Sequence, residues 1–356
     1  MNVYFLTGGY DACYYVRCLQ PLIYNGWWGA KTSIRSKPES MNKQFQGAMD
    51  ADIVVFQRPM QKEMLEAAKL LKQKGKKIVY DNDDTYQTDS GLPKQMTAML
   101  EEQIDEKLAM IDANLKEFVS IADLVTTTTE FLADEYRALN PNTIVLPNMV
   151  DPSDWEKPIR NKGKKIRIGL VGSVVNNQDY EPVTNTLQAL SKRDDITLVI
   201  LGLPPKTKET EYVQSFYQTE YEFWSKLDIE WHPFVSHPEY NDKLNSLALD
   251  IMLIPRADNY FNRCKSNVKF LEAAMCEVPV IAQGFPDGKS PYQDPKDAKH
   301  MLIAHTQEDW FNHLVTLIGD KKLRRQMGKD AKKYVLENYN IQDKAVLWKE
   351  AFQKLI

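Results

Sequence analysis

The segment from Pro255 to Ala282 reads PRADNYFNRCKSNVKFLEAAMCEVPVIA, and short apolar runs typical of buried strands begin before it and recur at its end. We expect strands at residues 250–254 and 278–281. A polar loop follows the first strand, and a helix is expected to open at about Ser266. The segment therefore predicts one strand–helix–strand unit of a parallel sheet.

Charged side chains share one face of this expected helix. Lys265, Lys269 and Glu272 are spaced four and three residues apart. A helix start with two ammonium groups and the Ser266 hydroxyl is suited to a diphosphate, and the Glu272 carboxylate can accept two protons from a sugar diol. A solvated charged face is the alternative. The position late in an alternating strand–helix half, where carboxyl ends of parallel strands form ligand crevices, favours a binding site.

The same strand–helix rhythm runs through the whole chain and restarts once. Residues 151–165, DPSDWEKPIRNKGKK, contain two prolines, a glycine and a lysine cluster, and form the best domain boundary. Two βα-rich halves predict the α/β class, with two doubly wound Rossmann-like domains facing a central cleft. The other strands are expected at 2–6, 51–56, 77–80, 123–127, 143–146, 166–171, 196–201 and 229–232.

Composition restricts the class of protein. The chain has 356 residues, a formal net charge of −4 and only four scattered cysteines, so neither nucleic-acid binding nor a disulfide framework is indicated. We expect a reduced, cytoplasmic protein, without a signal peptide or a membrane span. Tyr24, Trp27 and Trp28 allow peripheral membrane contact, although aromatic residues beside glycines more often close a core edge.

Polar residues follow the expected strands of the first half. The Gly8-Gly9 turn before Tyr10 can approach a ligand closely. The run from Asp81 to Asp84 has three possible roles: a cleft function, turn and capping chemistry, or a divalent metal site of the D-x-D kind. Arg17 and Arg58 are candidates for the same cleft.

The pattern P…DN-x-FN-x-CKSN-x-KFLEAA…VPVIA resembles the donor-binding segment of retaining glycosyltransferases with the GT-B fold, and is most similar to the group-1 family, family four. The resemblance implies that Lys269 contacts the nucleotide diphosphate and that Glu272 holds the ribose. Asn262, Lys265 and Ser266 belong to the same donor segment. Many members carry a second glutamate that faces the donor sugar, and Cys264 stands at that position here.

The resemblance extends to other strand ends. A YD-x-DD run, here ending in Asp83 and Asp84, faces the cleft on the acceptor side in similar bacterial transferases, so we expect these two aspartates to be catalytic. Gly172 and Ser173 are expected at the donor phosphates or sugar, although the basic pair that follows this strand in many members is missing. The acceptor side would comprise Gly8, Gly9, Tyr10, Arg17, Arg58 and Asp81.

These observations predict a GT-B glycosyltransferase with an acceptor-side domain at 1–155, a donor domain at 156–340 and a helix at 341–356 that packs back on the first domain. It would move a sugar from a UDP- or GDP-sugar to a hydroxyl of a cell-surface glycan precursor or a similar acceptor. Retention, no metal and no cofactor besides the nucleotide sugar are expected. The alternatives are a phage-type or nucleic-acid-modifying glycosyltransferase, and a degenerate sugar-nucleotide-binding protein.

Overall fold

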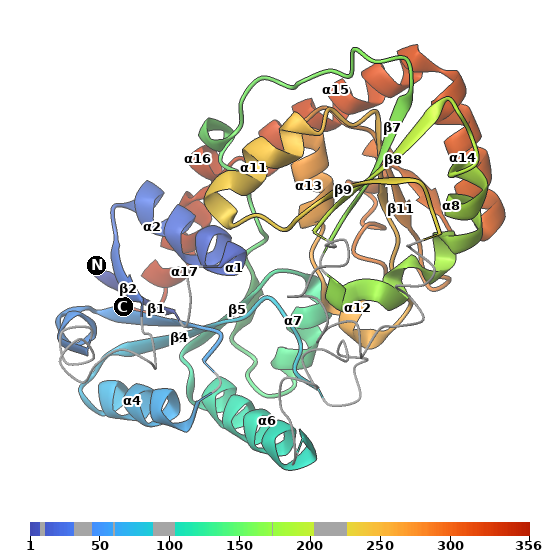
Figure 1. Cartoon of the computed structure of the whole chain (residues 1–356). Coiled ribbons are helices and arrows are strands. Elements are labelled where there is room, and N and C mark those ends of the chain that lie inside the picture. The colour runs from blue at the N-terminus through green and yellow to red at the C-terminus, as the bar shows by residue number, and fades with distance from the viewer. Residues whose placement is uncertain (8–10, 32–44, 60, 88–103, 173, 203–225) are drawn as a thin grey trace.

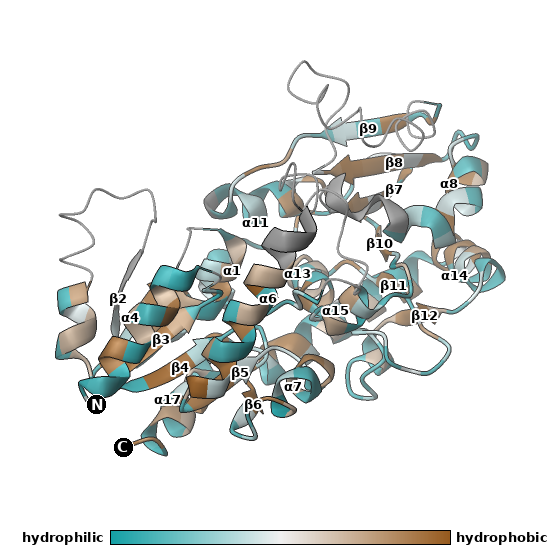
Figure 2. Cartoon of the chain, turned by 90° about the horizontal axis from the view of Figure 1, so that it is seen from below, coloured by the Kyte–Doolittle hydropathy of each residue, from teal (hydrophilic) through white to brown (hydrophobic). Residues whose placement is uncertain are grey.

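Two parallel six-stranded sheets organise the chain, one at the lower left and one at the upper right of Figure 1. The structure is a computed structural model that describes residues 1–7, 11–31, 45–59, 61–87, 104–172, 174–202 and 226–356. Its strands are rich in apolar residues, as Figure 2 shows, because helices cover both faces of such a sheet.

The first sheet has the order β2-β1-β3-β4-β5-β6. All five residues of β3 are buried, which explains why its sequence is almost entirely apolar. The strands are β1 (Val3–Thr7), β2 (Trp28–Lys31), β3 (Ile53–Gln57), β4 (Lys77–Asp81), β5 (Leu124–Thr127) and β6 (Thr143–Val145). The helices are α1 (Ala12–Tyr14), the π-helical η1 (Tyr15–Leu19), α2 (Gln20–Asn25), α4 (Lys62–Gln73), α6 (Ile104–Ile121) and α7 (Glu130–Arg137).

The second sheet has the order β12-β11-β10-β7-β8-β9. Its strands are β7 (Ile166–Val171), β8 (Ile196–Leu201), β9 (Ile229–His232), β10 (Ile251–Ile254), β11 (Val280–Gln283) and β12 (Leu302–Ala304). The longer helices of the second half of the chain are α8 (Thr184–Leu190), α11 (His237–Ser246), α13 (Val268–Met275), α14 (Gln307–Gly319), α15 (Lys321–Asn338) and α17 (Val346–Gln353), of which α17 belongs to the first sheet. Shorter helical turns are η2 (Pro152–Asp154), η3 (Val174–Val183), α12 (Tyr260–Cys264), η5 (Ala298–His300) and α16 (Ile341–Lys344).

Several local features differ from the sequence predictions. Strands β2 and β12 were not predicted, because they are short and lack an apolar alternation. The sequence also predicts helices at 94–120, 180–192 and 211–227. The helix at 180–192 begins as the 3-10 turn η3, which contains Pro182, and becomes α-helical only at Thr184. The expected helices at 94–120 and 211–227 lie partly or mostly outside the described residues.

The aromatic residues of the N-terminal segment divide between core and surface. Trp27 is buried and stacks on Phe5 and Phe352, with ring centroids 6.1 and 5.4 Å apart. Trp28 is 80% exposed. Closure of a core edge therefore accounts for Trp27 and leaves Trp28 on the surface.

The chain passes between the two halves at adjacent points. Val150 forms a parallel bridge with Asn340, and its amide donates to the Tyr339 carbonyl oxygen at 2.9 Å. After this bridge α17 places Trp348 and Phe352 in one apolar cluster with β1. The domain boundaries given above remain predictions, but these contacts place the C-terminal helix against the first sheet.

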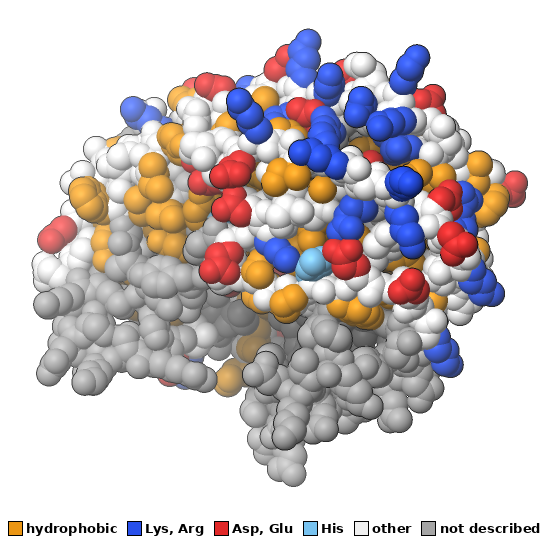
Figure 3. All heavy atoms as spheres, turned by 45° about the horizontal axis from the view of Figure 1, so that its top comes forward, with side chains coloured by type: hydrophobic (Ala, Val, Ile, Leu, Met, Phe, Trp, Pro, Cys, Tyr) orange, Lys and Arg blue, Asp and Glu red, His pale blue; other side chains and the backbone are white. Residues whose placement is uncertain are grey.

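Lysine and arginine side chains gather on the face shown in Figure 3. In Figure 1 this face carries α15 and the segment before β7. Because that segment enters β7, it lies at the amino edge of the second sheet, opposite the edge that forms ligand crevices. Among the described helices none combines the length and apolar character needed to cross a membrane. The exposed cations of these two segments are Lys157, Lys162, Lys164, Lys165, Lys321, Lys322, Arg325, Lys329 and Lys333.

Candidate functional site

Arg17 and Asp81 form a fully buried ion pair at the carboxyl edge of the first sheet. The Arg17 Nε and a terminal nitrogen donate to the two Asp81 oxygens at 3.1 and 2.6 Å, and the Thr126 hydroxyl donates to Asp81 at 2.6 Å. The side chains of Arg17 and Asp81 are 0% and 2% exposed. Their predicted contact with the acceptor is untested, and their burial gives them an internal role in holding η1 to β4.

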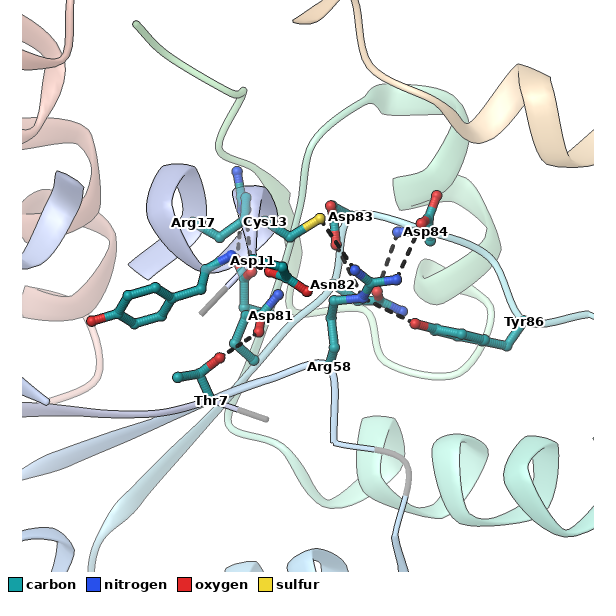
Figure 4. Close-up of polar contacts among 12 residues, drawn as sticks. Thr7, Asp11, Cys13, Arg17, Arg58, Asp81, Asn82, Asp83, Asp84 and Tyr86 are labelled. Carbon is teal, nitrogen blue, oxygen red and sulfur yellow. Dashed lines mark hydrogen bonds and ion pairs between the residues drawn. The ribbon is translucent and has the colours of Figure 1, made fainter. Parts of the chain in front are cut away.

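Arg58 lies at the centre of a second charged cluster (Figure 4). It directly follows β3 and has a φ of +51°, which is strained for a side chain of this size. Its guanidinium donates to the Tyr86 hydroxyl at 3.0 Å, the Cys13 sulfur at 3.1 Å and the Asp84 carboxylate at 3.3 Å. Asp83 lies at ion-pair distance, 3.4 Å. The predicted cleft residues Arg58, Asp83 and Asp84 are therefore brought together.

Asp83 is an ionised carboxylate with one unfilled position. Burial acts to raise the pKa of Asp83, but the Arg58 guanidinium, the Cys13 thiol and the Lys265 ammonium together hold it below its usual value. Its buried Oδ1 accepts no hydrogen bond from any residue that the structure describes. This oxygen lies 3.4 Å from the Arg58 Nε and is buried, so it has spare acceptor capacity that a hydroxyl reaches only when neighbouring side chains move.

The central segment contains two helices where one was predicted. Asn259 caps α12 by accepting from the Asn262 amide at 2.8 Å, and Lys265 then adopts an extended backbone with ψ of 156°. Helix α13 begins only at Val268. The expectation that Lys265 shares a helix face with Lys269 is therefore wrong, since the spacing argument assumes one uninterrupted helix.

Lys265 instead reaches across to the first half of the chain. Its ammonium pairs with the Asp84 carboxylate and lies 4.0 Å from the centroid of the Phe261 ring. Nearby, the Asn148 amide donates to the Ser266 hydroxyl oxygen at 2.9 Å. The two predicted sites, the donor segment and the aspartate cluster, thus meet at Lys265 and Asp84.

Cys264 occupies the position where similar enzymes carry a glutamate. It is buried in the apolar cluster of the first sheet, and its carbonyl oxygen accepts from the Thr129 hydroxyl at 3.3 Å. Burial raises the pKa of its thiol far above the usual range. The side chain packs between the halves as a neutral thiol.

Lys269 and Glu272 form a cluster with Tyr240 of α11. The Lys269 ammonium lies 3.2 Å from Glu272 Oε2 and donates to the Tyr240 hydroxyl oxygen at 3.0 Å. The Tyr240 hydroxyl in turn donates to Glu272 at 2.7 Å. Because the lysine and glutamate side chains stay 19% and 16% exposed, they remain within reach of a ligand.

The other predicted donor residues have structural partners. The Asn262 amide donates to Asp179 at 2.6 Å and to the Ala257 carbonyl oxygen at 2.9 Å. The Gly172 amide donates to the Leu201 carbonyl oxygen at 3.0 Å, so it is not the free donor that we expected. Four further predicted positions, Gly8, Gly9, Tyr10 and Ser173, lie outside the described residues.

Sequence reasoning did not single out Tyr240, Tyr86 and Cys13, which contact predicted site residues. It also missed Arg256, whose partner Asp179 accepts from the predicted Asn262. Tyr240 lies in the first turns of a helix after β9, and Arg256 lies directly after β10. Both therefore follow strand ends, which was a usable signal. Cys13 and Tyr86 carry no comparable pattern, since their roles depend on the position of Arg58.

The carboxylates of the first edge face cations. Among the residues that the structure describes, no group of three or more histidine, cysteine or acidic side chains is arranged to hold a metal ion. Asp81 pairs with Arg17, and Asp84 pairs with Arg58 and Lys265. The charge of this run is thus balanced within the protein.

Comparisons with known proteins agree with this geometry. Residues 183–350 match the family model described as glycosyl transferase-like, while a search of curated proteins finds no match. Anabaena Alr3699/HepE, solved with UDP and glucose, is similar in structure, with a TM-score of 0.66, 12% identity and coverage of 99% of this chain and 100% of that one. Sucrose-phosphate synthase from Thermosynechococcus elongatus has a TM-score of 0.64 at 14% identity, over 100% and 99% of the two chains.

WaaG, a glycosyltransferase involved in lipopolysaccharide biosynthesis, has a TM-score of 0.60 at 13% identity and covers 98% of each chain. At these identities the similarity establishes the fold, which confirms the predicted pair of Rossmann-like sheets. The family match covers most of the second half, including both Lys269 and Glu272. The chain thus has the GT-B fold of these structural neighbours, and its residues 183–350 match the glycosyl transferase-like family.

Proposed function

We propose that the protein transfers a sugar from a UDP- or GDP-sugar to a hydroxyl group of an acceptor. One observation carries this proposal: Lys265 and Asp84 pair across the two halves, so the donor segment and the aspartate cluster form one charged site. A sugar held at the first and a hydroxyl held at the second would be close enough to react.

The donor would bind at the carboxyl edge of the second sheet. Lys269 and Lys265 supply positive charge for the diphosphate, and Glu272 accepts the ribose hydroxyls. The Lys269–Glu272 contact supports these roles, because each side chain is partly exposed and bound to a partner that a ligand can replace. UDP is our first choice of nucleotide, since HepE was solved with UDP and with UDP-glucose.

The acceptor would bind against the first sheet. The ionised Asp83, whose Oδ1 has spare acceptor capacity beside Arg58, would orient the attacking hydroxyl once neighbouring side chains give way, and Asp84 would hold Lys265 near the leaving diphosphate. The bond between the anomeric carbon and the diphosphate oxygen breaks as the acceptor oxygen bonds to the same carbon, and the proton of the acceptor hydroxyl passes to the departing diphosphate. Catalysis would then rest mainly on positioning and on stabilising the charge of the departing diphosphate.

Further features of the reaction follow from the resemblance to family four. We propose retention of configuration and a reaction without metal, with lysines compensating the diphosphate charge. A cell-surface glycan precursor is the proposed acceptor class, supported by the role of WaaG in lipopolysaccharide biosynthesis. All four cysteines are free thiols, which suits the reducing cytoplasm that we propose as the compartment.

A thermal-shift screen tests the proposal. The wild type and Glu272→Ala are heated with UDP, GDP, ADP, CDP, dTDP and their sugars, with and without EDTA. A ligand that binds the native state raises its melting temperature. We expect one nucleotide to stabilise the wild type in EDTA and to leave Glu272→Ala unchanged.

Other outcomes would contradict specific parts of the proposed function. Stabilisation that disappears with EDTA and survives in Glu272→Ala would move the nucleotide to the Asp81–Asp84 run. Stabilisation without any nucleotide release from the donor sugar would indicate a degenerate binding protein. No stabilisation by any of the ligands would contradict the donor site itself.

A further inference from the structure

A recess opens at the carboxyl edge of the second sheet. It is small, with about 10 Å³ accessible to the centre of a water-sized sphere, and its walls are the ends of β7 and β10 together with Asp179 and Tyr180. In the order β12-β11-β10-β7-β8-β9 the chain runs outward in both directions from the β10–β7 pair. The recess therefore lies at the point where strand order reverses, the usual ligand crevice of a doubly wound sheet.

Arg256 contributes a cation to this recess. It directly follows β10, and its side chain is 12% exposed. One terminal nitrogen donates to Asp179 at 2.5 Å. Burial acts to lower the pKa of Arg256, but Tyr292 and Asp179 outweigh burial and raise it, so the guanidinium stays charged.

Asp179 is held in place from several directions. Besides Arg256, it accepts from the Ala257 amide at 3.0 Å and from the Asn262 side chain at 2.6 Å. Its negative charge is thus shared among three donors, and only one of them is a cation. The carboxylate orients Arg256 without occupying all of its donors.

Two buried donors beside the recess lack a well-aligned partner. The Arg256 Nε and the Tyr292 hydroxyl form no well-aligned hydrogen bond with any described residue, although the two side chains lie close enough to share a poorly aligned one. Tyr292 is fully buried. Buried donors without acceptors are costly, and a ligand that supplies oxygen acceptors removes that cost.

We propose that Arg256 binds a phosphate group of the nucleoside-diphosphate donor, with Asp179 and Asn262 as its positioning residues. Three observations point to an anionic ligand: the crevice position, the charged guanidinium and the unfilled Nε–H. The stretch from Gly172 to Asp179 has no lysine or arginine, so Arg256 supplies positive charge on this side of the crevice. This inference rests on the proposed function and adds a residue to it.

The alternative is that Arg256 only fixes the loop between β10 and α12 through its ion pair. The two roles differ in what they do to ligands with and without phosphate. A phosphate contact affects UDP and leaves uridine unchanged, whereas a displaced loop disturbs both.

The test is a calorimetric titration of UDP and uridine at 25 °C. The variants are Arg256→Gln, Arg256→Lys and the control Arg263→Gln. Arg263 belongs to the same segment and pairs with Asp258 at 2.7 Å, away from the recess residues. Circular dichroism and melting temperature establish that each variant is folded. Arg256→Lys keeps a positive charge if Arg256→Gln fails to fold.

We expect Arg256→Gln to weaken UDP binding by about 10- to 100-fold, the size of one charged hydrogen-bond contact, with uridine affinity unchanged. Arg256→Lys should lose less, and Arg263→Gln should bind UDP like the wild type. UDP affinity in folded Arg256→Gln or Arg256→Lys equal to that of the wild type overturns the inference and leaves the proposed function intact. Equal losses for UDP and uridine show the loop role instead and also overturn it. If the wild type binds no UDP, both the inference and the UDP-sugar site are wrong.

Discussion

The carboxyl edges of the two sheets carry charged clusters of different construction. At the first edge, Asp81 is held by two nitrogens of Arg17, and both side chains are almost completely removed from solvent. At the second edge, Lys269 and Glu272 share a 3.2 Å contact and remain partly exposed. A buried, multiply bonded pair is difficult to open, whereas a partly solvated pair exchanges partners at small cost.

This difference suggests a division of labour. At the first edge, arginines hold the aspartates in fixed positions. The second edge has groups that a ligand can recruit, namely Lys269, Glu272 and the Arg256 guanidinium. The Lys265–Asp84 pair connects the two edges.

The largest effect is expected from breaking the buried ion pair between Arg17 and Asp81. Asp81→Asn leaves the Arg17 cation buried without a counter-charge, which should lower the free energy of unfolding by about 3 kcal/mol or more. Urea unfolding monitored by circular dichroism measures this. Asp195→Asn removes a carboxylate from an exposed pair with Arg193 and serves as the control, with little expected change. Equal stabilities of the two variants would refute the distinction between the buried and the exposed ion pair.

The next effect concerns the partly exposed pair of Lys269 and Glu272 at the second edge. Lys269→Met should raise the donor KM by about 10- to 100-fold, because one charge-assisted phosphate contact is lost, with little change in stability. Initial rates at varied donor concentration give KM and kcat. Lys333→Met, a surface lysine on α15 that pairs with Glu337, is the matched control. A wild-type KM in Lys269→Met would remove this lysine from the donor site.

A smaller effect is expected at the connection between the edges. Lys265→Met removes the partner of Asp84 and a cation near the diphosphate, so kcat/KM should fall by about tenfold. Stability should change by less than about 1 kcal/mol, since the ammonium is partly solvated. If Lys265→Met instead destabilises the protein strongly and turns over normally once folded, the contact is only structural.

The smallest effect is a pH dependence of stability from Asp83. Its pKa is lower in the folded protein than the unfolded value of about 4, so its ionised form stabilises the fold at neutral pH. That contribution is complete above the unfolded pKa and is lost as the pH falls through the lowered folded pKa. The stability difference between wild type and Asp83→Asn should therefore shrink between pH 5 and acid pH in urea titrations. A difference that grows on acidification would show that the sign is wrong.

The sequence was sufficient for all strands of the two sheets except β2 and β12, because a strand buried on both faces requires a continuous apolar run such as that of β3. Helix ends that depend on a single nearby residue, such as a glycine, were also predictable. Gly75, expected to end its helix, has a φ of +81° directly after the α4 cap residue.

Contacts between distant residues could not be predicted. Asp84 and Lys265 are 181 positions apart, and Tyr240 and Glu272 are 32 apart on different helices. The break between α12 and α13 depends on the Asn259 cap and on the extended backbone of Lys265. The spacing of the residues alone is also compatible with one continuous helix, so it did not predict the break. Sequence reasoning therefore placed Lys269 and Glu272 correctly on one helix face but placed Lys265 on the wrong element.

The central claim is that the nucleotide binds at the second edge and not at the aspartate run of the first. The most direct test is a parallel calorimetric titration of UDP into the wild type, Glu272→Ala and Asp84→Asn in EDTA. The account predicts that Glu272→Ala loses UDP affinity by tenfold or more, while Asp84→Asn keeps it within a few-fold. Loss of binding in Asp84→Asn together with wild-type affinity in Glu272→Ala would contradict it.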